Sequence, residues 1–259
     1  MISFPQIDPV LLHIGPLAIR WYGLMYTLTF VLGWFLLRIQ VKRQSLGISS
    51  DALADLVMNT VLGVILGGRL GYILFYQFDY YLSNPMAMLR VWEGGMSFHG
   101  GLLGVLIAGY LFARQHQLSF LVLGDLLAVV TPVGLFLGRI GNFINGELWG
   151  RTTTLPWGVV FPGGGAEPRH PSQLYEAGLE GFFLFVLLWW LGGKPREPGF
   201  LGGVFLSGYA ICRLLVEMVR EPDAHLGFLA LGLTMGQWLT IPMLLIGIGL
   251  LYQAHKMRK

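Results

Sequence analysis

Apolar residues gather into long runs that are separated by short polar connections. A bilayer hydrocarbon core about 30 Å thick needs roughly 20 mostly apolar residues in each helix that crosses it. Seven runs come close to this length. The whole chain, residues 1–259, is therefore predicted to form one all-α membrane domain with seven transmembrane helices, at residues 17–38, 53–78, 98–114, 119–138, 173–191, 200–219 and 234–254.

The longest polar connection, RTTTLPWGVVFPGGGAEPRHP, separates the fourth and fifth predicted spans. Its threonines, prolines and glycines are typical of a loop, and the stretch WGVVF within it predicts one short strand. We expect a small outer loop region at about residues 150–171.

Glycines recur at a spacing of four in several spans, which is typical of helices that pack closely in a membrane. The pairs and triplets are Gly63–Gly67–Gly71, Gly100–Gly104, Gly134–Gly138 and Gly232–Gly236. The expected role of these glycines is helix packing.

Hydrophobic residues make up 54% of the chain and charged residues 12%, against about 25% charged residues in soluble domains. This composition excludes a soluble domain and predicts an integral membrane protein, with the lipid bilayer as one partner. The formal net charge of +3 does not indicate nucleic acid, because the basic residues are scattered between the apolar runs rather than gathered in one stripe.

Lysine and arginine are enriched in the cytoplasmic loops of membrane proteins. The loops after the first, third and fifth predicted spans and the C-terminal tail contain Arg38, Lys42, Arg43, Arg114, Lys194, Arg196, Lys256, Arg258 and Lys259. We therefore expect the N-terminus outside and the C-terminus in the cytoplasm. The remaining arginines lie on the outer side or inside the spans, where an unpartnered charge costs about 2.5–3.5 kcal/mol near the bilayer centre.

With this orientation, polar residues from five spans converge near the outer headgroups. They are Tyr22, Arg69, His99, Arg139, Asn142, Asn145, Glu147, Tyr209, Arg213, Glu217 and Arg220. The set has four arginines and only two carboxylates, and this excess of positive charge predicts an anionic ligand. A lipid phosphate is favoured over an aqueous anion, because the arginine fork fits phosphate oxygens.

Simpler readings stay open for several of these residues. Arg213 and Glu217 are spaced as a structural i,i+4 pair. Asn142 and Asn145 could cap or join helices, and His99 could be an ordinary interfacial histidine. For the chain as a whole, the main alternative is a transporter or channel for a small anion or a lipid headgroup. That alternative predicts repeated halves and polar residues at several depths, whereas here they share one level. The sequence contains no clustered metal ligands and no phosphate-binding glycine loop, so we expect no metal and no other cofactor.

The block GRIGNFINGELWG, residues 138–150, resembles the bacterial prolipoprotein diacylglyceryl transferases. Five further blocks resemble that family in the same order: WYGLMY at 21–26, GGRLGYILFY at 67–76, VWEGGMSFHGGLLG at 91–104, RHPSQLYE at 169–176 and GYAICRLLVEMVREPDAH at 208–225. The resemblance therefore covers most of the chain.

The resemblance implies that phosphatidylglycerol donates its diacylglyceryl group to the lipobox cysteine in the signal peptide of a preprolipoprotein. A thioether forms and glycerol phosphate leaves, which is the first step of bacterial lipoprotein maturation. It also implies a multi-pass protein of the bacterial inner membrane whose active site faces the outer leaflet.

By matching motif, the resemblance makes His99, Arg139 and Arg213 the expected catalytic residues. The expected headgroup-binding and supporting residues are Tyr22, Arg69, Asn142, Asn145, Glu147, Tyr209, Glu217 and Arg220. In the expected reaction Arg139 and Arg213 clamp the phosphate. His99 takes the thiol proton, since histidine has an ordinary pKa of about 6.5 and a thiol one of about 8.5. A role of His99 as a headgroup ligand stays open.

Overall fold

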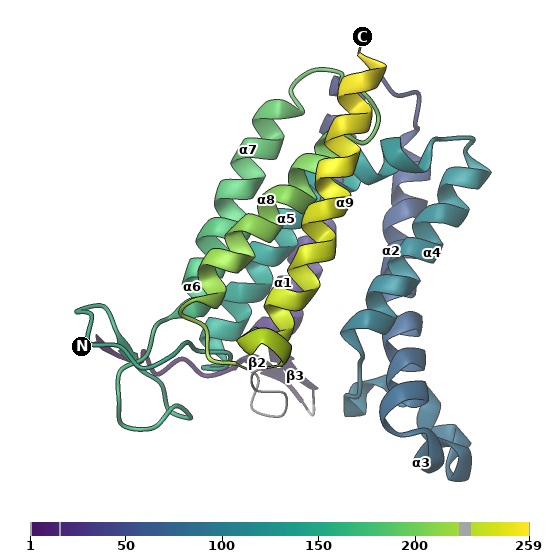
Figure 1. Ribbon diagram of the computed structural model, residues 1–259. Helices are drawn as coiled ribbons and strands as arrows, with labels where there is room; N and C mark the ends of the chain where they lie inside the picture. Colours follow the sequence, from purple (N-terminus) through teal and green to yellow (C-terminus); the bar gives the residue numbers. More distant parts are fainter. Residues whose placement is uncertain (1, 16, 223–228, 259) are drawn as a thin grey trace. The chain divides into compact units, whose positions relative to one another are not determined.

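The computed structural model describes residues 2–15, 17–222 and 229–258 (Figure 1). The chain forms two compact units: the first unit comprises residues 1–45 and 124–259, and the second unit comprises residues 46–123. The elements in chain order are β1 Ile2–Ser3, β2 Val10–Ile14, β3 Leu17–Arg20, α1 Trp21–Arg43, α2 Ser50–Tyr76, α3 Phe78–Ser83, η1 Pro85–Leu89, η2 Val91–Glu93, α4 Phe98–Gln115, α5 Phe120–Ile144, β4 Val159–Val160, α6 Ser172–Glu176, η3 Ala177–Phe183, α7 Leu184–Leu191, α8 Phe200–Glu217, η4 Ala230–Gly232 and α9 Met235–Met257.

Among the described residues, six helices are long and apolar enough to cross a membrane: Trp21–Arg43, Ser50–Tyr76, Phe120–Ile144, Ser172–Leu191, Phe200–Glu217 and Met235–Met257. Each lies where the sequence predicts a span. The third predicted span also forms a helix, α4, but it is not among the six. Its first turn contains His99 and two glycines, and its last turn contains Arg114 and Gln115, so its apolar stretch is shorter.

The first helix begins at Trp21 rather than at residue 17, because Leu17–Arg20 forms strand β3 and pairs with β2 in an antiparallel hairpin. The strand expected within WGVVF is confirmed as β4, Val159–Val160, which pairs in parallel with β1. The described chain is therefore mostly helical with four short strands, rather than purely α-helical.

The core of the first unit lies where α5, α7 and α8 meet. Val129, Leu184, Leu188 and Leu201 are almost completely buried there. Helix α9 packs along α8 (Figure 1), and a Cβ atom added at Gly203 of α8 would lie 2.9 Å from the Gly247 carbonyl oxygen of α9. This contact holds α8, which carries Arg213 and Glu217, against its neighbour.

The fifth predicted span consists of α6, the π-helical stretch η3 and α7 in one continuous run. A π-helical turn inserted in an α-helix is frequent at functional sites. At Gly181 an added Cβ atom would lie 2.7 Å from the Cα atom of Phe136 in α5. The π-helical stretch is therefore packed directly on the helix that carries Arg139.

In the second unit, α2 and α4 run antiparallel side by side (Figure 1). The glycine interpretation is confirmed here, because an added Cβ atom at Gly63 would lie 2.7 Å from the Gly104 carbonyl oxygen and one at Gly71 would lie 2.8 Å from the Gly100 Cα atom. Small residues let the two backbones touch.

The other two glycine pairs behave differently. A Cβ atom added at Gly134 would meet Thr29, and one added at Gly236 would meet the Glu217 carboxylate. Gly138 and Gly232 have no such neighbour within 4 Å among the described residues. For these two positions the role in helix packing stays a prediction.

Replacement of Gly63 by alanine should lower the thermal unfolding midpoint of the detergent-purified chain. The added methyl group has no room against Gly104, and overpacking of this kind costs about 1–3 kcal/mol. Gly109→Ala is the matched control in α4, since its added Cβ atom meets its nearest neighbour at an ordinary 3.5 Å. Equal midpoints for the two variants would contradict the glycine interface.

Candidate functional site

The buried carboxylate of Glu176 binds three arginines in the first unit. Its Oε2 atom lies 2.6 Å from Arg139 Nε and 3.2 Å from Arg213 Nη1. Its Oε1 atom lies 3.2 Å from Arg220 Nη1. The Glu176 side chain is completely buried, whereas the Arg139 side chain is 20% exposed. One carboxylate at the end of α6 thus joins α5, α8 and the segment that follows α8.

Arg213 is held from a second side. Its Nη2 atom lies 2.8 Å from Glu217 Oε2, the i,i+4 pair that the sequence indicates. The hydroxyl of Thr234 donates to the other oxygen of Glu217 at 2.7 Å. The Glu180 carboxylate, also completely buried, lies 3.9 Å from Arg213 Nη1. Arg213 is therefore enclosed by carboxylates on two helices.

A chain of polar side chains continues from Arg139 along the turn after α5. The Arg139 guanidinium donates to Asn142 Oδ1 at 3.3 Å, and Asn142 Nδ2 donates to Glu147 Oε1 at 2.9 Å. Asn145 Nδ2 donates to the same Glu147 oxygen at 3.1 Å. The side chain of Gln173 donates to the Glu147 carbonyl at 2.6 Å, which ties this turn to α6.

The two predicted tyrosines of the first unit lie next to these residues. A Cβ atom added at Gly141 would lie 2.9 Å from the Tyr22 ring, so Tyr22 packs on the helical turn of Asn142. Its hydroxyl lies 3.4 Å from that of Tyr26. Tyr209 lies near Arg139 and Arg213. The structure therefore brings eight predicted site residues together: Tyr22, Arg139, Asn142, Asn145, Glu147, Tyr209, Arg213 and Glu217, with Arg220 joined through Glu176.

The charge count made from the sequence was incomplete, because it omitted Glu176 and Glu180. With them, the arginines of the first unit meet buried carboxylates, so an excess of positive charge does not by itself call for an anion. The signal was present: two glutamates four residues apart inside an apolar span, where ionisable residues are expensive and usually functional. Glu176 is also the last residue of RHPSQLYE, one of the family-like blocks.

Arg69 and His99 belong to the second unit. Arg69 is buried, and its guanidinium donates to backbone carbonyls of residues 87–95. His99 lies exposed in the first turn of α4, with its ring 5.6 Å from that of Phe98.

The loop region 150–171, which is part of the first unit, is held by polar contacts to α6 and to the segment after α8. Arg151 Nε donates to the Arg220 carbonyl at 3.0 Å, and Trp157 Nε1 donates to the Tyr175 hydroxyl at 2.8 Å. His170 lies 3.3 Å from the same hydroxyl, and partial burial lowers the pKa of its imidazole. The loop therefore rests on α6, next to Glu176.

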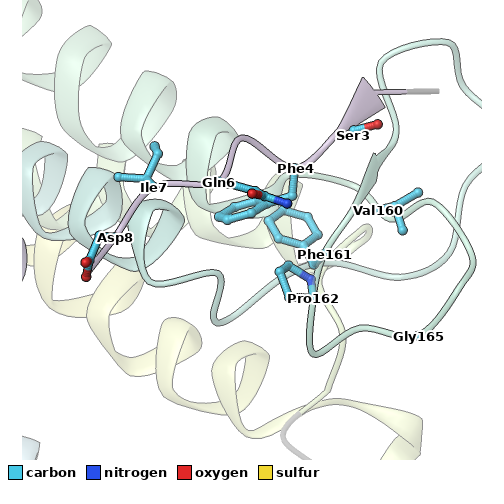
Figure 2. A pocket seen from close by; sticks show the side chains of 9 residues that line it. All are labelled: Ser3, Phe4, Gln6, Ile7, Asp8, Val160, Phe161, Pro162 and Gly165. Carbon is cyan, nitrogen blue, oxygen red and sulfur yellow. The ribbon is translucent and has the colours of Figure 1, made fainter. Parts of the chain in front are cut away.

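An open pocket lies between the N-terminal segment and this loop (Figure 2). The rings of Phe4 and Phe161 line the pocket. The centre of the Phe4 ring lies 5.6 Å from that of Phe143, the residue that follows Asn142 in the chain. The pocket is lined by Ser3, Phe4, Gln6, Ile7, Asp8, Val160, Phe161, Pro162 and Gly165. None of the predicted site residues lines this pocket, but Phe4, which does, packs on the end of α5 that carries Asn142.

Within the described part of the chain, no group of three or more His, Cys, Asp or Glu side chains could hold a metal ion.

The six membrane-length helices define a multi-pass membrane protein, and the buried arginine–glutamate cluster forms an ionic site within its first unit. The sequence model of one family, described as prolipoprotein diacylglyceryl transferase, matches residues 9–253. The chain belongs to this family.

Curated relatives of nearly the same length are named as enzymes of this family. The chain is 57% identical to the phosphatidylglycerol–prolipoprotein diacylglyceryl transferase of Idiomarina loihiensis, over 98% of this chain and 96% of the relative. The chain is 55% identical to the enzyme of that name from Legionella pneumophila strain Lens, over 96% of this chain and 98% of the relative. It is 56% to that of Bordetella parapertussis, over 96% of each chain. The comparisons give no support to the transport alternative.

Proposed function

We propose that this chain transfers the diacylglyceryl group of phosphatidylglycerol to a cysteine thiol of a prolipoprotein, the first step of lipoprotein maturation. The names of relatives that are 55–57% identical over nearly the whole chain support both substrates. The acceptor thiol is the lipobox cysteine of the signal peptide, as the resemblance of the sequence blocks implies.

The proposed location is the bacterial inner membrane, with the N-terminus outside and the site facing the outer leaflet. The distribution of lysine and arginine in the loops supports this orientation. Helix α4 is the proposed seventh span, since it packs along α2 through close glycine contacts and α2 is long enough to cross a bilayer. A single membrane domain formed by residues 1–259 stays a prediction.

The observation that carries the proposal is the convergence of Arg139 Nε and Arg213 Nη1 on one carboxylate oxygen, Glu176 Oε2. Two guanidinium groups that meet at one oxygen are prearranged for an oxyanion, and arginine forks suit phosphate geometry. The Arg139 side chain is 20% exposed and that of Arg213 12%, so neither is completely buried. A lipid phosphate is the ligand that this arrangement fits.

In the proposed reaction, the cysteine sulfur attacks the glyceryl carbon that carries the phosphate oxygen. A carbon–sulfur bond forms, the carbon–oxygen bond breaks, and its electron pair leaves on glycerol phosphate. Arg139 and Arg213 stabilise the charge that grows on that oxygen, because fixed donors aimed at developing charge lower the barrier. His99 accepts the thiol proton and later releases it to water.

The remaining residues orient the donor lipid. Tyr22, Asn142 and Tyr209 hydrogen-bond the headgroup in this proposal. Asn145 and Glu147 hold the Asn142 amide, and through it Arg139. Glu217 and Arg220 keep Arg213 and Glu176 in place.

The test uses the purified full chain in nanodiscs with phosphatidylglycerol and a lipobox peptide, and it follows the release of glycerol phosphate. We expect release with the cysteine peptide and none with a peptide in which that cysteine is serine. Release without thiol dependence, or transport of glycerol phosphate by the chain in sealed vesicles without cleavage of the lipid, would overturn the proposal.

A further inference from the structure

The guanidinium group of Arg69 is fully occupied by the chain's own backbone. Its Nε atom donates to the Met88 carbonyl at 3.0 Å. Its Nη2 atom donates to the carbonyls of Ala87 at 2.6 Å and Arg90 at 3.0 Å. Its Nη1 atom donates to those of Gly94 and Gly95. Five N–H groups thus meet five carbonyl oxygens.

This arrangement leaves little for an outside ligand. An arginine has five N–H donors in a fixed fork and no acceptor. Arg69 is only 5% exposed. One face of its guanidinium packs on Tyr81, with the central carbon 5.0 Å from the ring centre. Arg69 therefore has no spare donor for a phosphate, and Tyr81 covers one of its faces.

The loop that Arg69 binds is shaped to present these carbonyls. Gly94 and Gly95 both have positive φ angles, 86° and 77°, which residues with a side chain rarely adopt. At Gly95 an added Cβ atom would also lie 2.7 Å from the Tyr72 ring and 3.0 Å from Arg69 Nη1. The two glycines of VWEGGMSFHGG are therefore required where the loop meets Arg69.

The loop bound by Arg69 continues from Gly95 to His99 and makes further contacts with α2 on the way. The backbone N–H of Ser97 donates to the Gly68 carbonyl at 2.9 Å, next to Arg69 in α2. The Ser97 hydroxyl then accepts from the Gly100 N–H at 3.2 Å and caps α4. Gly100 in turn packs on Gly71 of α2. His99 thus lies in the first turn of a helix whose N-terminal end contacts α2 at two points, Gly68 and Gly71.

We propose that Arg69 is a positioning residue that clasps residues 87–95 and so sets the place of His99, rather than a ligand of the lipid phosphate. The consequence for catalysis rests on the proposed function, in which His99 takes the thiol proton. The clasp acts through His99, so loss of Arg69 and loss of His99 remove the same contribution.

Arg69→Gln and Arg69→Lys are the test variants, and Arg114→Gln is the control. Arg114 lies in the last turn of α4 over the Tyr110 ring, at the other end of the helix from His99. Hydrogen exchange of the amides of residues 94–101 is measured on the full chain in nanodiscs. Transfer kinetics are measured for the single variants, for His99→Gln and for the double variant Arg69→Gln/His99→Gln.

We expect faster exchange of residues 94–101 in both Arg69 variants and unchanged exchange in Arg114→Gln. We also expect kcat to fall on the order of 100-fold in Arg69→Gln, the scale set by misplacement of a catalytic group. The KM for phosphatidylglycerol should stay the same. The double variant should be no slower than His99→Gln alone, because coupled residues are non-additive.

Unchanged exchange of residues 94–101 in both Arg69 variants would overturn the clasp. A raised KM with unchanged kcat, and losses that multiply in the double variant, would instead make Arg69 a phosphate ligand and overturn the proposal. If the wild type shows no transfer at all, the proposed function fails, while the exchange measurement still decides the clasp.

Discussion

Replacement of Glu176 by glutamine should lower the transfer rate by about 100-fold or more, the scale expected when catalytic groups, here Arg139 and Arg213, are misplaced. Glutamine keeps one acceptor oxygen and places an NH₂ group where an arginine N–H now donates. Arg139 and Arg213 both bind Glu176 Oε2, so both lose the charged oxygen that holds their guanidinium groups in place. The variant should also be less stable, since breaking a buried ion pair typically costs about 3–5 kcal/mol.

The control for Glu176 is Glu221→Gln. Glu221 pairs with Arg169 at 3.2 Å and its side chain is 49% exposed, so its loss should change the rate less than twofold, consistent with the small worth of exposed pairs. Rates are compared at a temperature at which both variants are folded, with the folded fraction read from thermal unfolding. Near-normal activity of Glu176→Gln would show that the cluster is scaffolding only.

Replacement of Arg139 by lysine should lower kcat/KM for phosphatidylglycerol by at least about 100-fold. Arg139 contacts Glu176 through Nε and Asn142 through Nη1 while its side chain stays partly exposed. A lysine ammonium is a single point charge and cannot make these contacts and a phosphate contact at once. The charge is conserved, so the loss reports geometry rather than electrostatic attraction alone.

Arg20→Lys is the matched control for Arg139. Arg20 is exposed just before α1, and the same substitution there should leave kcat/KM within twofold. A loss confined to KM, which an excess of phosphatidylglycerol restores, would assign Arg139 to ground-state binding only. Full activity of Arg139→Lys would contradict a phosphate clamp.

Part of the site could be predicted because it is local in the chain. Arg139, Asn142 and Glu147 lie within nine residues, and the Arg213–Glu217 pair follows from helical spacing. Glu176 was missed because its partners lie on other helices, and charge counting along one segment cannot pair residues that are distant in sequence. The role of Arg69 was hidden for another reason: its partners are backbone carbonyls, which every residue carries and no sequence letter marks.

The same distinction holds for the fold. Apolar runs predicted the membrane-length helices, because burial in lipid requires a run of that length whatever the packing. The β2–β3 hairpin was missed, since Leu17–Arg20 is mostly apolar and merges with the span that follows. The π-helical stretch Ala177–Phe183 has the composition of an ordinary helix. Its π-helical backbone and its close packing on Phe136 are visible only in the structure.

The most direct test of the transferase account is the chemical nature of the product on the lipobox peptide. Wild-type chain, phosphatidylglycerol and peptide are incubated, and the peptide is analysed by mass spectrometry before and after treatment with hydroxylamine at neutral pH, which cleaves thioesters and leaves oxygen esters intact. The account predicts a diacylglyceryl adduct on the cysteine that survives hydroxylamine, as a thioether does, and that is nearly absent with Glu176→Gln. An acyl adduct that hydroxylamine removes, or an unmodified peptide with folded enzyme, would contradict it.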